Sequence, residues 1–273
     1  FMATKLIRLL NQEGVFPQNW KTVEEVNQTE IDSVQDSVLS QLSWEDISEH
    51  NLVAYSNSVA NYNSKPVNQL AIPDLLDFMN LIPNNGLILD IAAGHLRDSL
   101  YMIDPESRDA LNREEMISPS PEKRLRVIPL EGSIDFLDSC VGRFKRNLNR
   151  IPLIIAGDFM TPGQGMVYHS SDENLARIFT KDQFEPVLDG IWSCAGYMIH
   201  MAPGKLGETT RKWAEALKQN GILGMSYINR KEGMSEMKLL ASRSAPGEVK
   251  VFSHYTSSEV DEAFESAGLK LID

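Results

Sequence analysis

Residues Gly86–Tyr101, GLILDIAAGHLRDSLY, decide the fold class of this chain. The apolar run that begins at Leu87 ends at Asp90, and the small residues of Ala92–Gly94 lead into a segment of helical character. A strand, a small-residue turn and a helix in this order form the unit by which doubly wound α/β domains bind an adenine-containing cofactor. Small residues let the backbone approach a ligand closely, and the first helical turn offers free N–H groups.

The composition is that of an ordinary globular protein, since 42% of the 273 residues are hydrophobic and 23% are charged. The net charge of −12 argues against nucleic acid as a partner, because its phosphates require clustered lysine and arginine. No apolar run approaches the roughly 20 residues that span a bilayer, so we expect no membrane partner. The two cysteines, Cys140 and Cys194, form neither a metal motif nor a disulfide framework. We therefore expect no bound metal and a cytoplasmic, reducing location.

The first 50 residues are predicted to form a helical N-terminal extension that packs on or over the rest of the chain as a lid. Apolar residues recur at Val23, Val26, Val34 and Val38, a spacing that is typical of amphipathic helices. The remaining residues, 51–273, are predicted to form one further domain.

Residues 51–273 alternate strand-like apolar runs with helical segments. This pattern predicts an α/β fold with a doubly wound, mostly parallel sheet of six or seven strands and helices on both faces. The predicted strands are Leu87–Ile91, Arg126–Leu130, Leu153–Ala156, Gly190–Cys194, Gly221–Ile228 and Leu269–Ile272. The predicted helices include Ile72–Ile82, Lys205–Gln219 and Ser257–Ala267. Residues 101–125 and 160–186 exceed ordinary connections of about 2–6 residues and are predicted to be insertions, either over the cleft or on the surface.

The turn after the first strand excludes two common nucleotide-binding classes. A nicotinamide-binding loop would have glycine at positions 92, 94 and 97, whereas this chain has Ala92, Gly94 and Arg97. Arg97 is hard to reconcile with the close helix–strand packing that glycine permits. A phosphate-binding P-loop is also absent, because no Gly-Lys-Ser/Thr follows the turn. An NAD-dependent oxidoreductase therefore ranks third among the functions considered, behind the two described below.

Several segments of the chain stand in a characteristic order: Leu89–Gly94 followed by Arg97–Leu100, then Leu130–Ser133, Ala156–Phe159, Asp189–Cys194, Leu217–Leu223 and Phe252–Val260. In this order they resemble the motifs of the class I S-adenosylmethionine-dependent methyltransferases of small-molecule type. Upstream, Tyr55 and Tyr62 resemble a tyrosine pair that many such members carry. The resemblance extends from about Tyr55 to Leu271, and its specificity lies in the order of the segments.

This resemblance implies S-adenosyl-L-methionine as the cofactor and S-adenosyl-L-homocysteine as its product. It also implies that Glu131 holds the ribose hydroxyls and that Asp158 faces the adenine amino group, and an ionised carboxylate suits both because it only accepts hydrogen bonds. Arg97 is the nearest cation for the cofactor's own carboxylate, or else forms an ion pair with Asp98 or Asp104. The implied cofactor-binding residues are Tyr55, Tyr62, Asp90, Ala92, Gly94, Arg97, Glu131, Gly132, Asp158, Phe159, Ser193 and Cys194.

The chain departs from the family's pattern at the turn itself. The family's first motif usually has three alternating glycines, and here Ala92 and Leu96 replace the first and the third. Leu96 would be strained if its position requires a positive φ, and its bulk could crowd the cofactor. No counterpart of the family's antiparallel seventh strand is expected after Ile272.

These observations predict a methyltransferase that acts on a small-molecule acceptor, since no feature marks a nucleic-acid or protein substrate. The alternative is a non-catalytic, methyltransferase-like protein that binds or regulates a partner. A general base is needed only if the acceptor loses a proton. The candidates are His200, His254 and Tyr255, and the alternative for each is a packing role.

Overall fold

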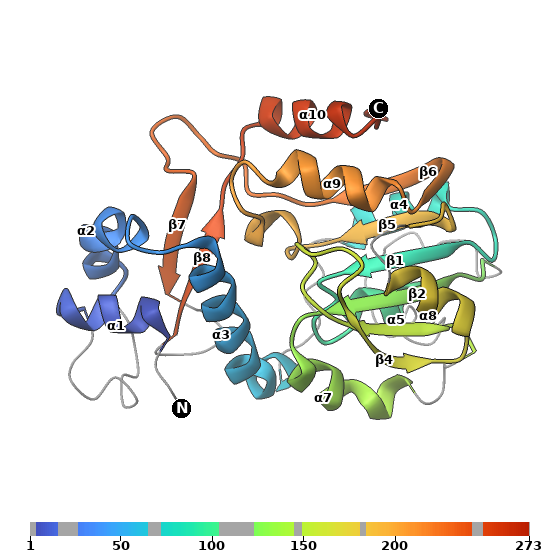
Figure 1. Ribbon diagram of the computed structural model, residues 1–273, viewed down its shortest axis with the longest axis horizontal. Coiled ribbons are helices and arrows are strands. Elements are labelled where there is room, and N and C mark those ends of the chain that lie inside the picture. The colour runs from blue at the N-terminus through green and yellow to red at the C-terminus, as the bar shows by residue number, and fades with distance from the viewer. Residues whose placement is uncertain are drawn as a thin grey trace.

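The computed structural model describes residues 4–15, 27–64, 72–103, 123–144, 149–180, 184–241 and 248–272. Six strands form one sheet in the order β4-β3-β2-β1-β5-β6, in which β4 is antiparallel and the other strands are parallel (Figure 1). The strands are β1 (Leu87–Ile91), β2 (Arg126–Glu131), β3 (Leu153–Ala156), β4 (Met166–Ser170), β5 (Leu188–Ser193) and β6 (Leu217–Met225). The predicted mostly parallel, doubly wound sheet is confirmed.

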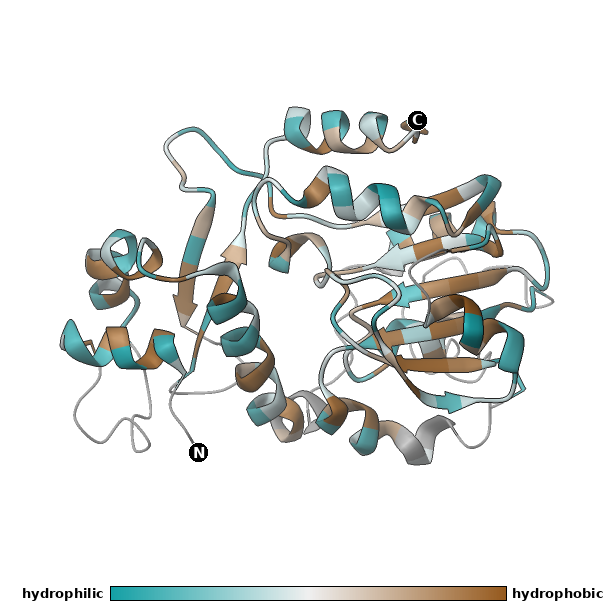
Figure 2. Cartoon of the chain, viewed as in Figure 1, coloured by the Kyte–Doolittle hydropathy of each residue, from teal (hydrophilic) through white to brown (hydrophobic). Residues whose placement is uncertain are grey.

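Helices cover both faces of this sheet, as predicted. Side chains of successive strand residues point to opposite faces, so that Ile88 packs into one core and its neighbours Leu87 and Leu89 into the other. One face carries α4 (Ile72–Leu81), α5 (Arg97–Ile103) and α7 (Ile134–Phe144), and the other carries α8 (Glu173–Phe179), α9 (Leu206–Ala214) and α10 (Ser257–Ser266). Figure 2 shows the resulting pattern, with largely hydrophobic central strands between helices of mixed character.

The strand order places a ligand crevice beside β1. From β1 the chain winds outward through β2 and β3 on one side, and then through β5 and β6 on the other. The connection that follows β1 therefore runs to one side of the sheet, and the connection that follows β5 runs to the other. The carboxyl ends of these two strands form the topological switch point, at which such sheets bind ligands.

Near the C-terminus one predicted strand is wrong and one predicted helix is shorter than expected. Leu269–Ile272 forms no strand and follows α10 as an irregular, exposed segment, with Leu271 84% exposed. The predicted helix Lys205–Gln219 ends at Ala214, and β6 already begins at Leu217. Asn220 then lies inside β6 with a φ of 65°, where the register between β5 and β6 shifts. Of the two predicted insertions, 160–186 contains β4 and α8, and residues 104–122 of the first lie outside the described residues.

A second body, which we call the small lobe, stands beside the sheet in Figure 1. It consists of α1 (Lys5–Gln12), α2 (Gln28–Leu39), α3 (Trp44–Ser64) and the antiparallel hairpin of β7 (Met237–Ala241) and β8 (Val249–Ser253). Its core joins apolar residues of the three helices to Leu239, Val249 and Val251 of the hairpin. Of the predicted helical extension, α1, α2 and the first part of α3 are present, while Val23 and Val26 lie outside the described residues. Helix α3 runs without a break through the predicted boundary at residue 50.

Side chains of α2 and α3 complete the hydrogen bonding of the hairpin. On β7, the Gln28 amide pairs with Leu239 O and Ala241 N at 2.9 Å each. On β8, the Asn51 amide pairs with the N–H and the carbonyl of Val251, also at 2.9 Å each. Because a two-stranded hairpin is at best marginally stable alone, these contacts bind the lobe into one unit.

Candidate functional site

A cavity of about 840 Å³ lies at the carboxyl ends of β1, β2, β3 and β5, at the topological switch point of the sheet. Ligand sites for small molecules measure about 300–1,000 Å³, so this cavity lies near the upper end of the range. Helix α3 of the small lobe forms its opposite wall through Ser48, Asn51, Leu52 and Tyr55. The site therefore lies between the two bodies of the molecule.

The turn after β1 has the backbone of a glycine-rich loop although two glycines are replaced. Ala92, Gly94 and Leu96 have φ values of 57°, 55° and 61°, so all three alternating positions are left-handed. The predicted strain at Leu96 is therefore present, at a cost on the order of 1 kcal/mol for a residue with a side chain. The predicted crowding is absent, because the Leu96 side chain is buried in the core and does not line the cavity.

The turns after β1 and β5 approach each other closely at the base of the cavity. A Cβ on Gly196 would lie 2.4 Å from the Cβ of Ala92, a distance that real atoms do not adopt. Only glycine fits at position 196 while Ala92 keeps its side chain. Both residues line the cavity.

Glu131, at the end of β2, lies at the cavity with its side chain largely buried. Its carboxylate accepts hydrogen bonds from Gly94 N at 2.6 Å and from Ser133 N at 2.8 Å. Burial raises the pKa of Glu131, and the backbone N–H donors oppose that shift. An ionised carboxylate has about four acceptor positions, more than these donors use, so it can also accept from ligand hydroxyls.

A second acidic group lies beneath the turn. Asp90 is buried and accepts a 2.5 Å hydrogen bond from Ser99 Oγ. Burial and then the nearby Asp98 raise the pKa of Asp90 to about 8. Asp98 in turn accepts from Trp192 Nε1 at 2.8 Å and forms an ion pair with Arg97 at 2.5 Å. Arg97 thus takes the alternative predicted for it, an ion pair with Asp98, and still lines the cavity.

The other predicted cofactor-binding residues fall into three groups. Gly132, Asp158, Phe159 and Cys194 line the cavity. Ser193 does not, because its hydroxyl donates to Ile91 O at 2.8 Å and accepts from Tyr197 N, which ties β5 to β1. Tyr62 lies on α3, but its side chain is outside the described residues.

His200 is the one predicted general base that the structure brings to the cavity. It lies in the short helix η2 (Met198–His200) after β5. Its Nε2 is 2.7 Å from the hydroxyl of Tyr55, and its Nδ1 is 3.2 Å from Val251 O. Burial, and secondarily the charge of Lys250, lower the pKa of His200 to about 4. The Lys250 ammonium lies 3.8 Å from the centre of the Tyr55 ring.

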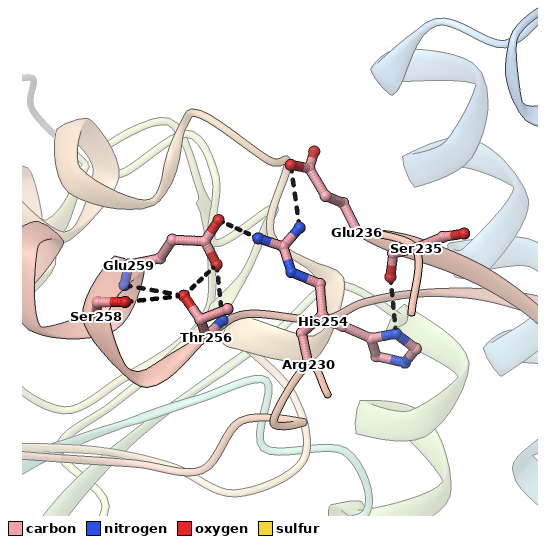
Figure 3. A network of polar contacts seen from close by, with 7 residues as sticks. All are labelled: Arg230, Ser235, Glu236, His254, Thr256, Ser258 and Glu259. Carbon is pink, nitrogen blue, oxygen red and sulfur yellow. Dashed lines mark hydrogen bonds and ion pairs between the residues drawn. The ribbon is translucent and has the colours of Figure 1, made fainter. Parts of the chain in front are cut away.

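His254 and Tyr255 lie away from this cavity, so the structure does not bring these two predicted bases to the candidate site. His254 is buried, and its Nδ1 is 3.2 Å from Ser235 O (Figure 3). The Tyr255 hydroxyl donates to Met201 O at 2.7 Å. Both line a smaller hollow, where Arg230 bridges Glu236 and Glu259, as Figure 3 shows.

Sequence reasoning named Tyr55 of α3 as a site residue but missed Asn51 and Leu52 of the same helix and the contribution of β8. Asn51 and Leu52 lie four and three residues before Tyr55 on α3, so helical spacing could have placed Asn51 on the same face. Lys250 had no comparable signal, because β8 lies 195 residues (250 − 55) beyond Tyr55. Only the packing of the small lobe brings this lysine to the tyrosine ring.

In the described parts of the chain, no three His, Cys, Asp or Glu side chains are grouped so that they could hold a metal ion. No described helix is both long and apolar enough to cross a membrane.

No family model and no curated protein matches this chain. Solved structures do resemble it. Magnesium protoporphyrin IX methyltransferase from Synechocystis PCC 6803, solved with bound S-adenosylmethionine, is 11% identical with a TM-score of 0.48, over 85% of this chain and 89% of that one. The [4+2]-cyclase SpnF is 16% identical with a TM-score of 0.47, over 85% and 73%. A possible exported protein from Bordetella parapertussis is 13% identical with a TM-score of 0.40, over 60% of this chain and 43% of its own length. Similarities this remote assign no activity, so function has to follow from the site itself.

Proposed function

We propose that this chain binds S-adenosyl-L-methionine in the large cavity and transfers its methyl group to a small-molecule acceptor. The observation that carries the proposal is Glu131, a buried carboxylate at the end of β2 that faces the cavity one strand away from the switch point. The backbone N–H groups of Gly94 and Ser133 hold this carboxylate in place. A fixed carboxylate at this position suits the two hydroxyls of a ribose.

The charge of the cavity supports a cationic ligand. Five carboxyl groups and one guanidinium line it: Glu49, Asp90, Asp98, Glu131, Asp158 and Arg97. The pKa of about 8 keeps Asp90 largely protonated at pH 7, and Asp98 is paired with Arg97, so the acidic character comes from Glu49, Glu131 and Asp158. The sulfonium and ammonium groups of the cofactor suit such a lining. Arg97, although paired with Asp98, is the guanidinium available for the cofactor's carboxylate.

The bound cofactor supplies an activated methyl group on a sulfonium, so the chain mainly has to orient the acceptor. In this proposal Asp158 and Phe159, after β3, lie at the adenine end. Cys194 and Gly196, after β5, lie at the methyl end, beside Tyr55 and His200. Since α3 closes the opposite wall, the acceptor is a small molecule rather than a polymer. We further propose a cytoplasmic location, which the two free cysteines support.

Calorimetry tests the cofactor site directly. We expect S-adenosyl-L-methionine and S-adenosyl-L-homocysteine to bind with micromolar affinity, and Glu131→Ala to weaken both by about 10- to 100-fold, because hydrogen bonds to a charged group are lost. Glu232→Ala, at an exposed turn, is the matched control and should bind like the wild type. Absence of heat and of any thermal shift at millimolar cofactor would refute the proposal. Binding without turnover on a broad acceptor panel would favour the non-catalytic alternative.

A further inference from the structure

The contacts of His200 bear on which of its nitrogens carries the proton. Nδ1 lies 3.2 Å from Val251 O, which can only accept, and 3.2 Å from the Asn51 amide nitrogen, which donates one of its two hydrogens to Val251 O at 2.9 Å. We take Nδ1 as the protonated nitrogen, the tautomer in which Val251 O accepts from it. In a neutral imidazole Nε2 is then unprotonated and accepts the 2.7 Å hydrogen bond from the Tyr55 hydroxyl.

This arrangement fixes what Tyr55 can offer to a molecule in the cavity. Its proton points to His200, so the phenol oxygen meets a ligand as a hydrogen-bond acceptor. The Lys250 ammonium over the ring withdraws electron density from the phenol, which strengthens its hydroxyl as a donor to His200. The lowered pKa of His200, about 4, keeps its imidazole neutral at pH 7.

We propose that the methyl acceptor is a neutral molecule with a hydroxyl group, and that Tyr55 and His200 together receive the hydroxyl proton during transfer. This inference rests on the function proposed above. A lone pair of the acceptor oxygen forms the new bond to the methyl carbon, and the electrons of the broken carbon–sulfur bond stay on sulfur as a neutral thioether. The hydroxyl proton passes to the Tyr55 oxygen, while the Tyr55 proton passes to His200 Nε2. The imidazolium then keeps its Nδ1–H on Val251 O.

The pair has a chemical use for a hydroxyl acceptor that it lacks for an amine. A protonated ether is a strong acid, so a hydroxyl needs a proton acceptor during the transfer, and even a weakly basic imidazole can serve. A neutral amine attacks with its lone pair and needs no base in the transfer step. An anionic acceptor would face the lone pairs of Tyr55 and the acidic lining of the cavity.

The first test needs no turnover. Side-chain ¹⁵N NMR of the whole protein at pH 7 should show His200 protonated at Nδ1 and unprotonated at Nε2. Tyr55→Phe should shift the Nε2 signal, whereas Tyr227→Phe, at a half-buried tyrosine whose hydroxyl is 3.1 Å from Ser257 Oγ, should not. The opposite tautomer would overturn the inference.

The second test uses matched probes: phenol and 1-naphthol against aniline, 1-naphthylamine and thiophenol. In the complex with S-adenosyl-L-homocysteine, we expect the hydroxyl probes to bind, and Tyr55→Phe to weaken them about tenfold through one lost hydrogen bond. With S-adenosyl-L-methionine, His200→Gln should lower kcat by about 100-fold or more and leave KM within about twofold, because general base catalysis is lost while Tyr55 still binds. Preferred methylation of the amines or the thiol, no binding of a hydroxyl probe, or wild-type behaviour of Tyr55→Phe would overturn the inference. These outcomes leave cofactor binding intact, whereas failure of the proposed function removes it.

Discussion

The two bodies of this molecule pair the backbone hydrogen-bonding groups of their strands in different ways. In the six-stranded sheet, strands pair with strands and both faces are covered by apolar helix surfaces. In the small lobe, side chains of α2 and α3 form hydrogen bonds to the backbone of the β7–β8 hairpin, chiefly those of Gln28, His50 and Asn51. The sheet is therefore held by groups that every residue carries, and the lobe by a few particular side chains.

Because of this difference, we expect the small lobe to be more sensitive than the sheet to the loss of single side chains. Asn51 and the His50 side chain are buried against the main chain of β8, so the loss of either leaves buried polar groups without partners. The same helix forms one wall of the cavity through Tyr55. Damage to the lobe should therefore reach the site even where the sheet is intact.

Acid should produce the largest difference between the two bodies. Burial lowers the pKa of His50 and of His200 from 6.5 to about 4, so below pH 6.5 the unfolded chain binds protons that these folded imidazoles do not. The contribution of each neutral histidine to the free energy of unfolding is therefore fully present above pH 6.5. It is lost as the pH falls from 6.5 toward 4, by on the order of 3 kcal/mol for each histidine. Asp90 acts in the opposite direction: its raised pKa contributes stability below 3.8 that is lost as the pH rises through about 8. Hydrogen exchange at pH 4.5 and 7, corrected for intrinsic rates, should show acid opening α1–α3 and β7–β8 before β1–β3. Equal opening of both bodies at pH 4.5 would contradict the expectation that the small lobe is the more acid-sensitive of the two.

Replacing Asn51 should be the most damaging single change in the lobe. Asn51→Ala leaves the buried N–H of Val251 unpaired and leaves its carbonyl with His200 Nδ1 as a partner, which we expect to lower the free energy of unfolding by about 1–3 kcal/mol. Asn80→Ala, at an exposed position of α4, is the control and should stay within about 0.5 kcal/mol. Urea unfolding measures both, and similar losses for the two variants would mean that the amide contacts do not hold the hairpin.

In the sheet, the sensitive point is the contact between the two turns at the cavity. Gly196→Ala places a methyl group against Ala92 and should lower the free energy of unfolding by about 1–3 kcal/mol. The double variant Ala92→Gly/Gly196→Ala removes the clashing Cβ and should recover most of this loss. Gly142→Ala, where a Cβ meets nothing within 4 Å, is the control. Urea unfolding of the wild type, both single variants, the double variant and the control measures this coupling, and additive effects in the double variant would contradict it.

The smallest expected effect is relief of the left-handed turn. Ala92→Gly alone should raise the free energy of unfolding by up to about 1 kcal/mol, because glycine adopts a positive φ without strain. Ala93→Gly is the matched control at a position without a positive φ and should lower it. Thermal and urea unfolding can measure the pair. If both variants lose stability, the turn is not strained.

Much of the sheet was predictable because its signals are local. β1, β3 and β5 are short runs of apolar residues, and each lies in the structure where its run does in the sequence. β4 was missed because Met166–Ser170 is a half-exposed edge strand without a clear apolar run. Leu269–Ile272 was overpredicted because apolar alternation in a short segment does not supply a partner strand. The pairing of the lobe joins residues about 200 positions apart, a separation at which sequence pattern carries no signal.

By itself, the sequence determined the doubly wound sheet, the turn at Ala92–Gly94 and the acid at Glu131, because strand burial and turn composition are written in neighbouring residues. The tertiary structure alone decided that His200, rather than His254 or Tyr255, faces the cavity. It also decided that Tyr55 and Lys250 meet there. The physical reason is that the surroundings of a side chain set its chemistry, and Tyr55, Asn51 and Val251 reach His200 only when the small lobe packs against the sheet.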